Sequence, residues 1–140
     1  MFMAPRDPLL LLATLAVDAS FGVVLLTLEN YQALGRFDQQ WLAACIAAHV
    51  AVYASYAVPP SLRRRLRVFS DYVLYCAMVT APLLRSKPLL EVAVGSMTSV
   101  GVLYYTHSRR CVLTDAQWSP LAEWLYFPLL ALQLAALLGR

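Results

Sequence analysis

Two side chains that are able to carry chemistry lie where charge is costly. Asp18 is the midpoint of an apolar stretch over residues 8–28, and His49 is the midpoint of another over residues 40–58. An ionisable group at the middle of a membrane helix costs at least about 2.5 to 3.5 kcal/mol, so each needs a reason to be there. Since consecutive spans are usually neighbours, the pair predicts a ligand-binding or proton-relay site at one depth, with the carboxylate orienting the imidazole. The alternative is a packing pair without chemistry.

A haem or quinone site is the next chemistry to consider. Bis-histidine haem needs two imidazoles that face each other at one depth, and His107, the other histidine, ends a later stretch, so haem b through His49 is not expected. The dipeptide Asp71–Tyr72 resembles the quinone-site Asp–Tyr of the small succinate dehydrogenase anchor, over two residues of the chain. That family carries its haem-ligating histidine on the same helix as the dipeptide, whereas His49 belongs to another stretch. The resemblance implies a quinone- or haem-binding anchor as a third hypothesis.

Familiar catalytic motifs do not occur in the sequence. It has no glycine-rich phosphate loop, no GxSxG, no HExxH and no Cys and His pair at liganding spacing. The three cysteines, Cys45, Cys76 and Cys111, are widely spaced and are typical of small buried hydrophobes rather than a zinc or dithiol site. We therefore expect neither an enzyme nor a resident metal or cofactor.

The strongest charge cluster, Arg63, Arg64, Arg65 and Arg67, follows Pro59 and Pro60. Ten arginines and one lysine give the chain a net charge of +3, and they sit between apolar stretches, which is typical of topogenic charge and not of a nucleic-acid surface. We expect the cluster to form a loop that binds an anionic lipid such as cardiolipin, or an acidic partner. The alternative is a plain topology signal.

Composition predicts the elements that must position these groups. The chain is 61% hydrophobic and 14% charged, with a mean hydropathy of +0.62, whereas soluble domains are about half apolar and a quarter charged. A helix needs about 20 apolar residues, and at least about 17, to cross a bilayer. We therefore predict an all-α polytopic membrane protein, one domain over residues 1–140, with short loops. The five predicted spans cover residues 8–28, 40–58, 68–84, 89–106 and 121–138.

The third and fourth predicted spans are short and lie close together. If they form a re-entrant hairpin, four helices remain. If all five cross, the positive-inside rule places the amino terminus and the arginine cluster on the inner side. That side then carries Arg6, Arg63, Arg64, Arg65, Arg67, Arg109 and Arg110, and the other side carries Arg36, Arg85, Lys87 and Arg140.

Small residues recur at every fourth position of the second predicted span, at Ala43, Ala47, Ala51 and Ser55. Such a row lets another helix approach closely in lipid. Together with short loops and no reaction centre, it favours an accessory subunit of a larger membrane complex, plausibly of the respiratory chain or another energy-converting assembly. Its partners are then other membrane subunits and anionic lipids.

A stand-alone transporter or ligand-binding bundle that uses Asp18 and His49 is the second hypothesis. The near absence of lysine favours an organellar inner membrane, with the mitochondrial one as first candidate.

Overall fold

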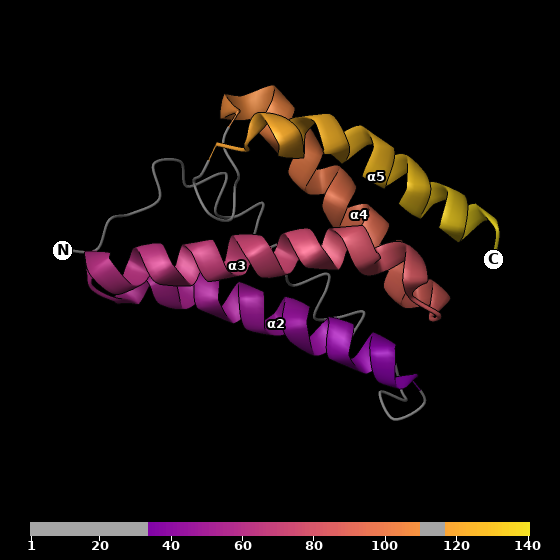
Figure 1. Cartoon of the computed structure of the whole chain (residues 1–140), viewed down its shortest axis with the longest axis horizontal. Helices are drawn as coiled ribbons and strands as arrows, with labels where there is room; N and C mark the ends of the chain where they lie inside the picture. The colour runs from indigo at the N-terminus through magenta and orange to yellow at the C-terminus, as the bar shows by residue number, and fades with distance from the viewer. Residues whose placement is uncertain (1–33, 110–116) are drawn as a thin grey trace.

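The computed structural model describes residues 34–109 and 117–140, and within these ranges the chain is helical and contains no strand. Figure 1 labels the α-helices of these ranges, α2 to α5. In chain order the elements are α2 (Arg36–Ala57), α3 (Pro60–Thr80), the 3₁₀ helix η2 (Ala81–Leu83), α4 (Lys87–Leu103), the π-helix η3 (Tyr104–Ser108) and α5 (Pro120–Leu138).

Proline and serine mark where the helices begin. Proline suits the first turn of a helix, since its fixed φ is already helical and its missing N–H would have no partner there. Pro60 is the first residue of α3 and Pro120 the first of α5. Ser86 and Ser119 precede α4 and α5, and each hydroxyl accepts a hydrogen bond from a backbone N–H three residues later, which caps the helix.

The arginine cluster lies in a helix, and the expected loop over these residues is wrong. α2 ends at Ala57 and α3 begins at Pro60, so residues 61–67 form the first two turns of α3. Arg and Leu are good helix formers, and the double proline ends one helix and begins the next, so no longer connection is needed.

Two described helices are long and apolar enough to cross a membrane, residues Lys87–Thr106 and Pro120–Leu138. They correspond to the predicted spans 89–106 and 121–138. The predicted spans 40–58 and 68–84 fall within α2, α3 and η2, but polar residues in α2 and the arginines of α3 lower the mean hydropathy of these helices. The span predicted at 8–28 lies outside the described residues. The prediction of five spans is therefore not supported.

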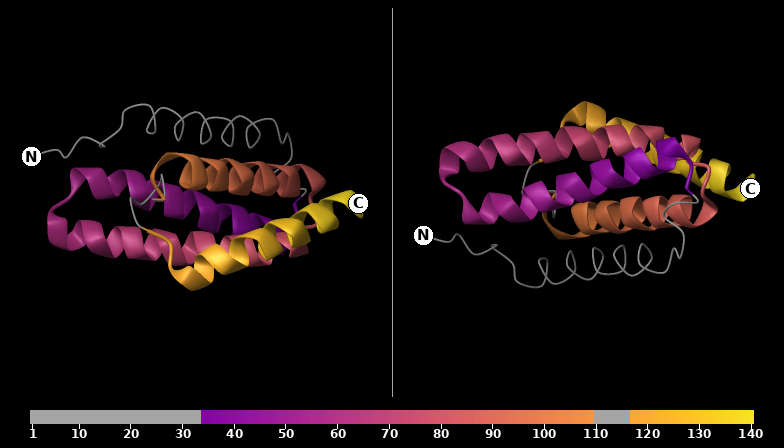
Figure 2. Two further views of the ribbon diagram at one scale, coloured as in Figure 1. Left: turned by 90° about the horizontal axis from the view of Figure 1, so that it is seen from above. Right: turned by 90° about the horizontal axis from the view of Figure 1, so that it is seen from below.

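Helices α2 and α3 lie side by side along their length, as both views in Figure 2 show. A larger cluster of buried side chains joins Trp41, Leu42 and Cys45 of α2 to Ala77 of α3, to η2 and to the first half of α4. A smaller one places Val52 of α2 against Leu74, Val100 and Trp118. The core therefore lies where α4 and η2 meet the α2–α3 pair.

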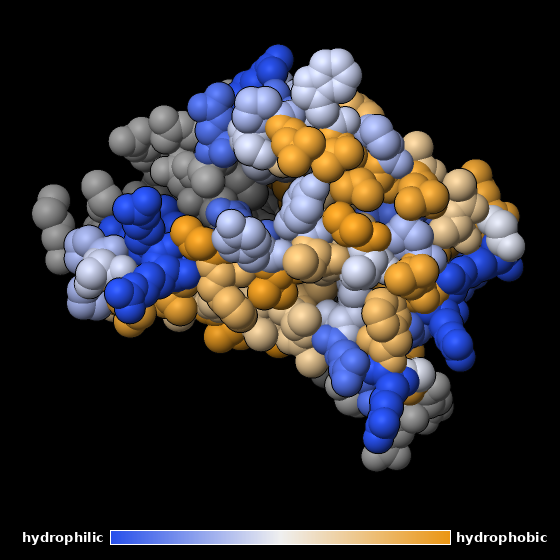
Figure 3. All heavy atoms as spheres, in the orientation of Figure 1, coloured by the Kyte–Doolittle hydropathy of each residue, from blue (hydrophilic) through white to orange (hydrophobic). Residues whose placement is uncertain are grey.

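The most hydrophilic residues gather toward two ends of the described bundle (Figure 3), and the part between them holds one charged residue, Asp71 near the middle of α3. At one end the buried Asp38 carboxylate contacts the backbone of Arg85, and Arg140 contacts Pro82; at the other, the side chain of Arg63 contacts the last turn of α2. Residues 39–62, 72–84, 92–108 and 124–139 contain no Asp, Glu, Lys or Arg. These stretches form the uncharged band, and at a rise of about 1.5 Å per residue it extends about 28 Å along α2, about 13 Å along α3 and about 22 Å along α5.

Candidate functional site

His49 is half-buried in the middle of α2. Its Nδ1 lies 2.7 Å from the Cys45 carbonyl oxygen, one turn earlier. Because a carbonyl only accepts, Nδ1 carries the hydrogen, and Nε2 of a neutral ring is then an acceptor. Nε2 and an ionised carboxylate are both acceptors. A hydrogen bond between Nε2 and Asp18 therefore requires one additional proton, carried either by the imidazole ring or by the carboxyl group. Asp18 lies outside the described residues, so the Asp18–His49 pair stays a prediction.

The structure divides the predicted row of small residues. Ala51 and Ser55 are buried, whereas Ala43 and Ala47 are exposed. An α-helix has 3.6 residues per turn, so a row of every fourth position rotates by about 40° at each step and leaves one face within a few turns. Four such positions therefore cannot all face one neighbour.

The surface by which α2 meets α3 follows alternating steps of three and four residues instead. Trp41, Cys45, Ala48, Val52 and Ser55 are its buried positions on α2. This heptad spacing keeps one stripe of a helix facing its partner.

Three hydrogen bonds from side chains to backbone carbonyls fix the register of this α2–α3 seam. They join Trp41 Nε1 to the Ala77 carbonyl at 2.9 Å, Ser70 Oγ to the Ala48 carbonyl at 2.9 Å and Arg63 Nε to the Ser55 carbonyl at 3.0 Å. Steps of seven residues forward along α2 match steps of seven back along α3, as an antiparallel pair requires. The small Ala48, Ala77 and Ser70 allow the two backbones to come close enough for these bonds.

Two of the four clustered arginines are engaged in the fold. Besides its bond to Ser55, Arg63 donates to the Val58 carbonyl at 3.3 Å. Arg67 donates to the Ser55 hydroxyl at 3.3 Å, and its guanidinium lies 5.3 Å from the ring centroid of Tyr56. The last carbonyls of a helix lack internal donors and carry partial negative charge, so these cations cap the end of α2.

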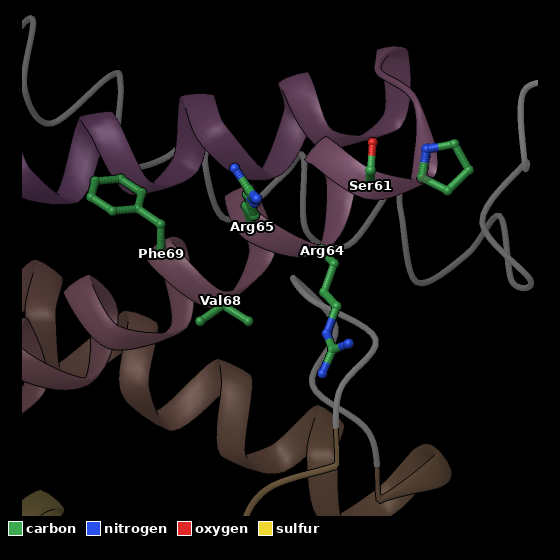
Figure 4. Close-up of a pocket in the computed structure, with 6 residues that line it drawn as sticks. Ser61, Arg64, Arg65, Val68 and Phe69 are labelled. Carbon is green, nitrogen blue, oxygen red and sulfur yellow. The ribbon is translucent and has the colours of Figure 1, made fainter.

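The other two arginines point outward. Arg64 and Arg65 are exposed, and neither makes a hydrogen bond or ion pair with any residue in the described ranges. They border an open hollow on the first three turns of α3, together with Pro60, Ser61, Val68 and Phe69. Figure 4 shows the two side chains extending away from the helix in different directions. The cluster is therefore two pairs of arginines with different roles.

Asp38 has a structural role that the sequence did not reveal. It is 1% exposed, and its two carboxylate oxygens accept hydrogen bonds from the backbone N–H of Arg85 at 3.1 Å and of Ser86 at 2.7 Å. These groups lie at the start of α4, where a negative charge is favourable. Asp38 thus ties the beginning of α2 to the turn before α4. Its partners are almost fifty residues away in sequence, and no local pattern signals them.

Gln133 of α5 replaces a helical hydrogen-bond donor that is missing at Pro82. Pro82 has no N–H, so the Met78 carbonyl four residues earlier lacks its usual helical partner. Gln133 Nε2 of α5 donates to that carbonyl at 2.8 Å. Its Oε1 is buried without a hydrogen-bond partner in the structure. The residue attaches α5 to the end of α3 and leaves one acceptor unsatisfied.

An aromatic cluster joins η3 to the start of α5. The buried Tyr104 hydroxyl donates to Glu123, and the Trp118 ring stacks on Tyr104 with centroids 4.0 Å apart and 7° between planes. Arg109 lies 3.9 Å from the Glu123 carboxylate. These contacts bind the carboxylate on two sides, so Glu123 acts within the fold rather than as a free acid.

Chemistry beyond these contacts is limited in the described ranges. They hold no group of three or more His, Cys, Asp or Glu that is arranged to bind a metal ion. Comparison of the chain with protein-family models, curated proteins and solved structures gave no match. The function is therefore argued from the geometry of this chain.

Proposed function

We propose that the protein is a helical subunit of a larger membrane assembly. The uncharged band supports this placement along α2 and α5, where its extents of about 28 and 22 Å approach the roughly 30 Å of hydrocarbon in a bilayer. Along α3 the band is shorter and is bounded by Asp71. The proposed arrangement retains five spans, with residues 8–28 as the first and with α2 and α3 crossing together as a hairpin. The proposed assembly is a respiratory or other energy-converting complex of an organellar inner membrane, a class suggested by the short loops and the lack of catalytic motifs.

The observation that carries the proposal is the outward face of α2. Its exposed positions follow the same alternation of three and four residues as the seam and are small or apolar: Ala43, Ala47, Val50, Ala54 and Ala57. Without a hydrophobic drive between helices in lipid, close backbone approach across small residues is what holds helices together. α2 thus carries one stripe of small or apolar residues that packs on α3 and a second, exposed stripe on another face. The exposed stripe is suited to packing against a helix of another subunit.

The outer face of α5 supports the membrane setting. Leu121, Trp124, Phe127, Leu132 and Leu138 are all exposed, and Trp124 reaches 81% exposure. An apolar face of this extent is unfavourable in water, but it is normal against lipid or a partner helix.

Replacing Ala47 with Trp tests the subunit role. Ala47 is exposed, so the larger side chain should leave the fold intact while it keeps a neighbouring helix away from α2. A blue-native gel of membranes extracted in mild detergent should show the wild-type chain in a large particle and Ala47→Trp outside it. Ala47→Ser, which keeps the residue small at the same position, is the matched control and should stay in the particle. A wild-type chain that migrates alone, or an Ala47→Trp chain that stays in the particle, would contradict the proposal.

A second candidate is a transporter or ligand-binding bundle that uses Asp18 and His49. The observation in its favour is the hydrogen bond from His49 Nδ1 to the Cys45 carbonyl, which makes Nε2 the acceptor of the neutral ring. A proton shared between that nitrogen and Asp18 would make transport depend on pH. Flux or ligand binding by the purified protein should then lose its pH dependence in Asp18→Asn, and an unchanged pH profile would reject this function.

A further inference from the structure

The face of α3 that points away from α2 carries a continuous apolar row with a cation near its start. At steps of three and four residues, the exposed positions are Leu62, Arg65, Phe69, Tyr72, Cys76, Val79 and Leu83. Phe69 is 49% exposed and Tyr72 is 71% exposed. The row begins at the charged end of the bundle and continues into the uncharged band, so a molecule that lies along it meets charge first and then apolar surface.

Arg64 and Arg65, near the start of this row, have no ion-pair partner among the described residues. Arg63 and Arg67 cap α2, while Arg64 and Arg65 stay exposed beside them. The first turn of a helix also carries partial positive charge, which adds to that of the arginines. Glu123, at the same end of the bundle, is already occupied by Tyr104 and Arg109. An anion is therefore the complementary ligand for this end of α3.

We propose that Arg64 and Arg65 bind the phosphate of an anionic phospholipid whose acyl chain lies along Phe69, Tyr72 and Cys76. Guanidinium groups pair with phosphate through two parallel hydrogen bonds. A soluble anion would use the arginines alone, whereas a phospholipid also covers the apolar row that begins one turn later. Tyr72 presents an amphipathic ring near this boundary, as aromatic residues at membrane interfaces do. A zwitterionic lipid brings a second cation to the arginines, so an anionic headgroup is favoured.

This inference rests on the membrane placement in the proposed function, but it does not rest on partner subunits. The sequence predicts that all four clustered arginines bind lipid. The inference narrows this role to Arg64 and Arg65, because Arg63 and Arg67 cap the end of α2. The same cluster thus separates into a structural pair and a binding pair.

Native mass spectrometry of the purified full-length protein tests the proposal. The protein in mild detergent is offered phosphatidylglycerol or phosphatidylcholine with identical acyl chains, and the bound lipid is counted. Wild type should retain phosphatidylglycerol preferentially. Arg64→Gln/Arg65→Gln should lose this retention by on the order of tenfold. The control Arg85→Gln/Lys87→Gln removes the same charge from exposed side chains at the opposite end and should stay within about twofold of wild type.

Two further measurements define the ligand. Phe69→Asn should weaken phosphatidylglycerol retention, because it removes part of the apolar row and leaves both arginines in place. Glycerophosphoglycerol, the headgroup without acyl chains, should not displace the lipid.

Equal loss in both double variants, no preference for the anionic lipid, or displacement by the headgroup alone would overturn the proposal. A thermal melt of each variant verifies that it is folded. Because the measurement uses the isolated protein, its failure would leave the blue-native result unaffected, and a failed assembly test would leave the lipid preference standing.

Discussion

Helices α2 and α3 are held together along their length, whereas α5 is attached at separate points. The α2–α3 seam repeats a hydrogen bond from a side chain to a backbone carbonyl every seven residues. α5 is attached through Glu123 to Tyr104, through the Tyr126 hydroxyl to the Met97 carbonyl and through Gln133 to Met78. Only 11% of the apolar stretch in α5 is buried inside the protein, against 39% of the apolar stretch that includes α4. The difference indicates that α2 and α3 form a continuously packed pair, whereas much of the apolar surface of α5 is exposed.

Ala48→Leu should break the seam with the largest effect. Ala48 is fully buried, and its carbonyl accepts the Ser70 bond. The added bulk forces the two backbones apart and should lower the free energy of unfolding by about 3 kcal/mol. Ala47→Leu adds the same bulk at the neighbouring exposed position and should change it by less than about 0.5 kcal/mol. Reversible unfolding in detergent measures both, and equal effects would contradict the assigned seam.

Asp38→Ala removes the tie between the start of α2 and the turn before α4. Two part-buried backbone N–H groups lose a charged acceptor, so the free energy of unfolding should fall by about 2 kcal/mol. Asp38→Asn keeps one acceptor oxygen and should lose about half as much. The same unfolding measurement applies, and an unchanged Asp38→Ala protein would show that the carboxylate does not hold this end of the bundle.

Trp41→Phe probes a single bond of the seam. It removes the indole N–H that donates to the Ala77 carbonyl but keeps an aromatic ring in the core. We expect a loss of about 1 kcal/mol, since interhelical hydrogen bonds in membranes are individually modest. A loss as large as that of Ala48→Leu would mean that hydrogen bonding, rather than close packing, dominates the seam.

Gln133→Met should have the smallest effect and sharpens the contrast between the seam and α5. The change removes the donor to Met78, but it also removes the buried Oε1 that has no hydrogen-bond partner. These two effects oppose each other, so unfolding should change by less than about 1 kcal/mol. A loss of 2 kcal/mol or more would mean that Oε1 has a partner that the described contacts do not include.

Features that depend on local sequence were predictable. The prolines and the polar links predicted the helices with approximate bounds, because proline acts on its own turn and on the residue before it. The loop predicted over the arginine cluster is wrong because a run of charges does not by itself end a helix. Arg is compatible with the first turns of a helix.

Features that depend on which helix face meets which neighbour were not predictable. The division of Arg63 and Arg67 from Arg64 and Arg65 follows from the rotation of α3 against α2, which sequence spacing leaves open. Asp38 and Gln133 find their partners only after the chain has folded back, and both partners are backbone groups that carry no residue-type signal. Gln133 stands out as a polar residue in an apolar stretch but without its role, whereas Asp38 lies among polar residues and does not stand out.

The central claim is that the uncharged band of the helices lies inside a bilayer. Alkaline carbonate extraction of native membranes, followed by flotation on a density gradient, tests it most directly. The account predicts that the chain floats with the membrane lipids after extraction, as a protein whose helices cross the bilayer does. Release of the chain into the soluble fraction would contradict it.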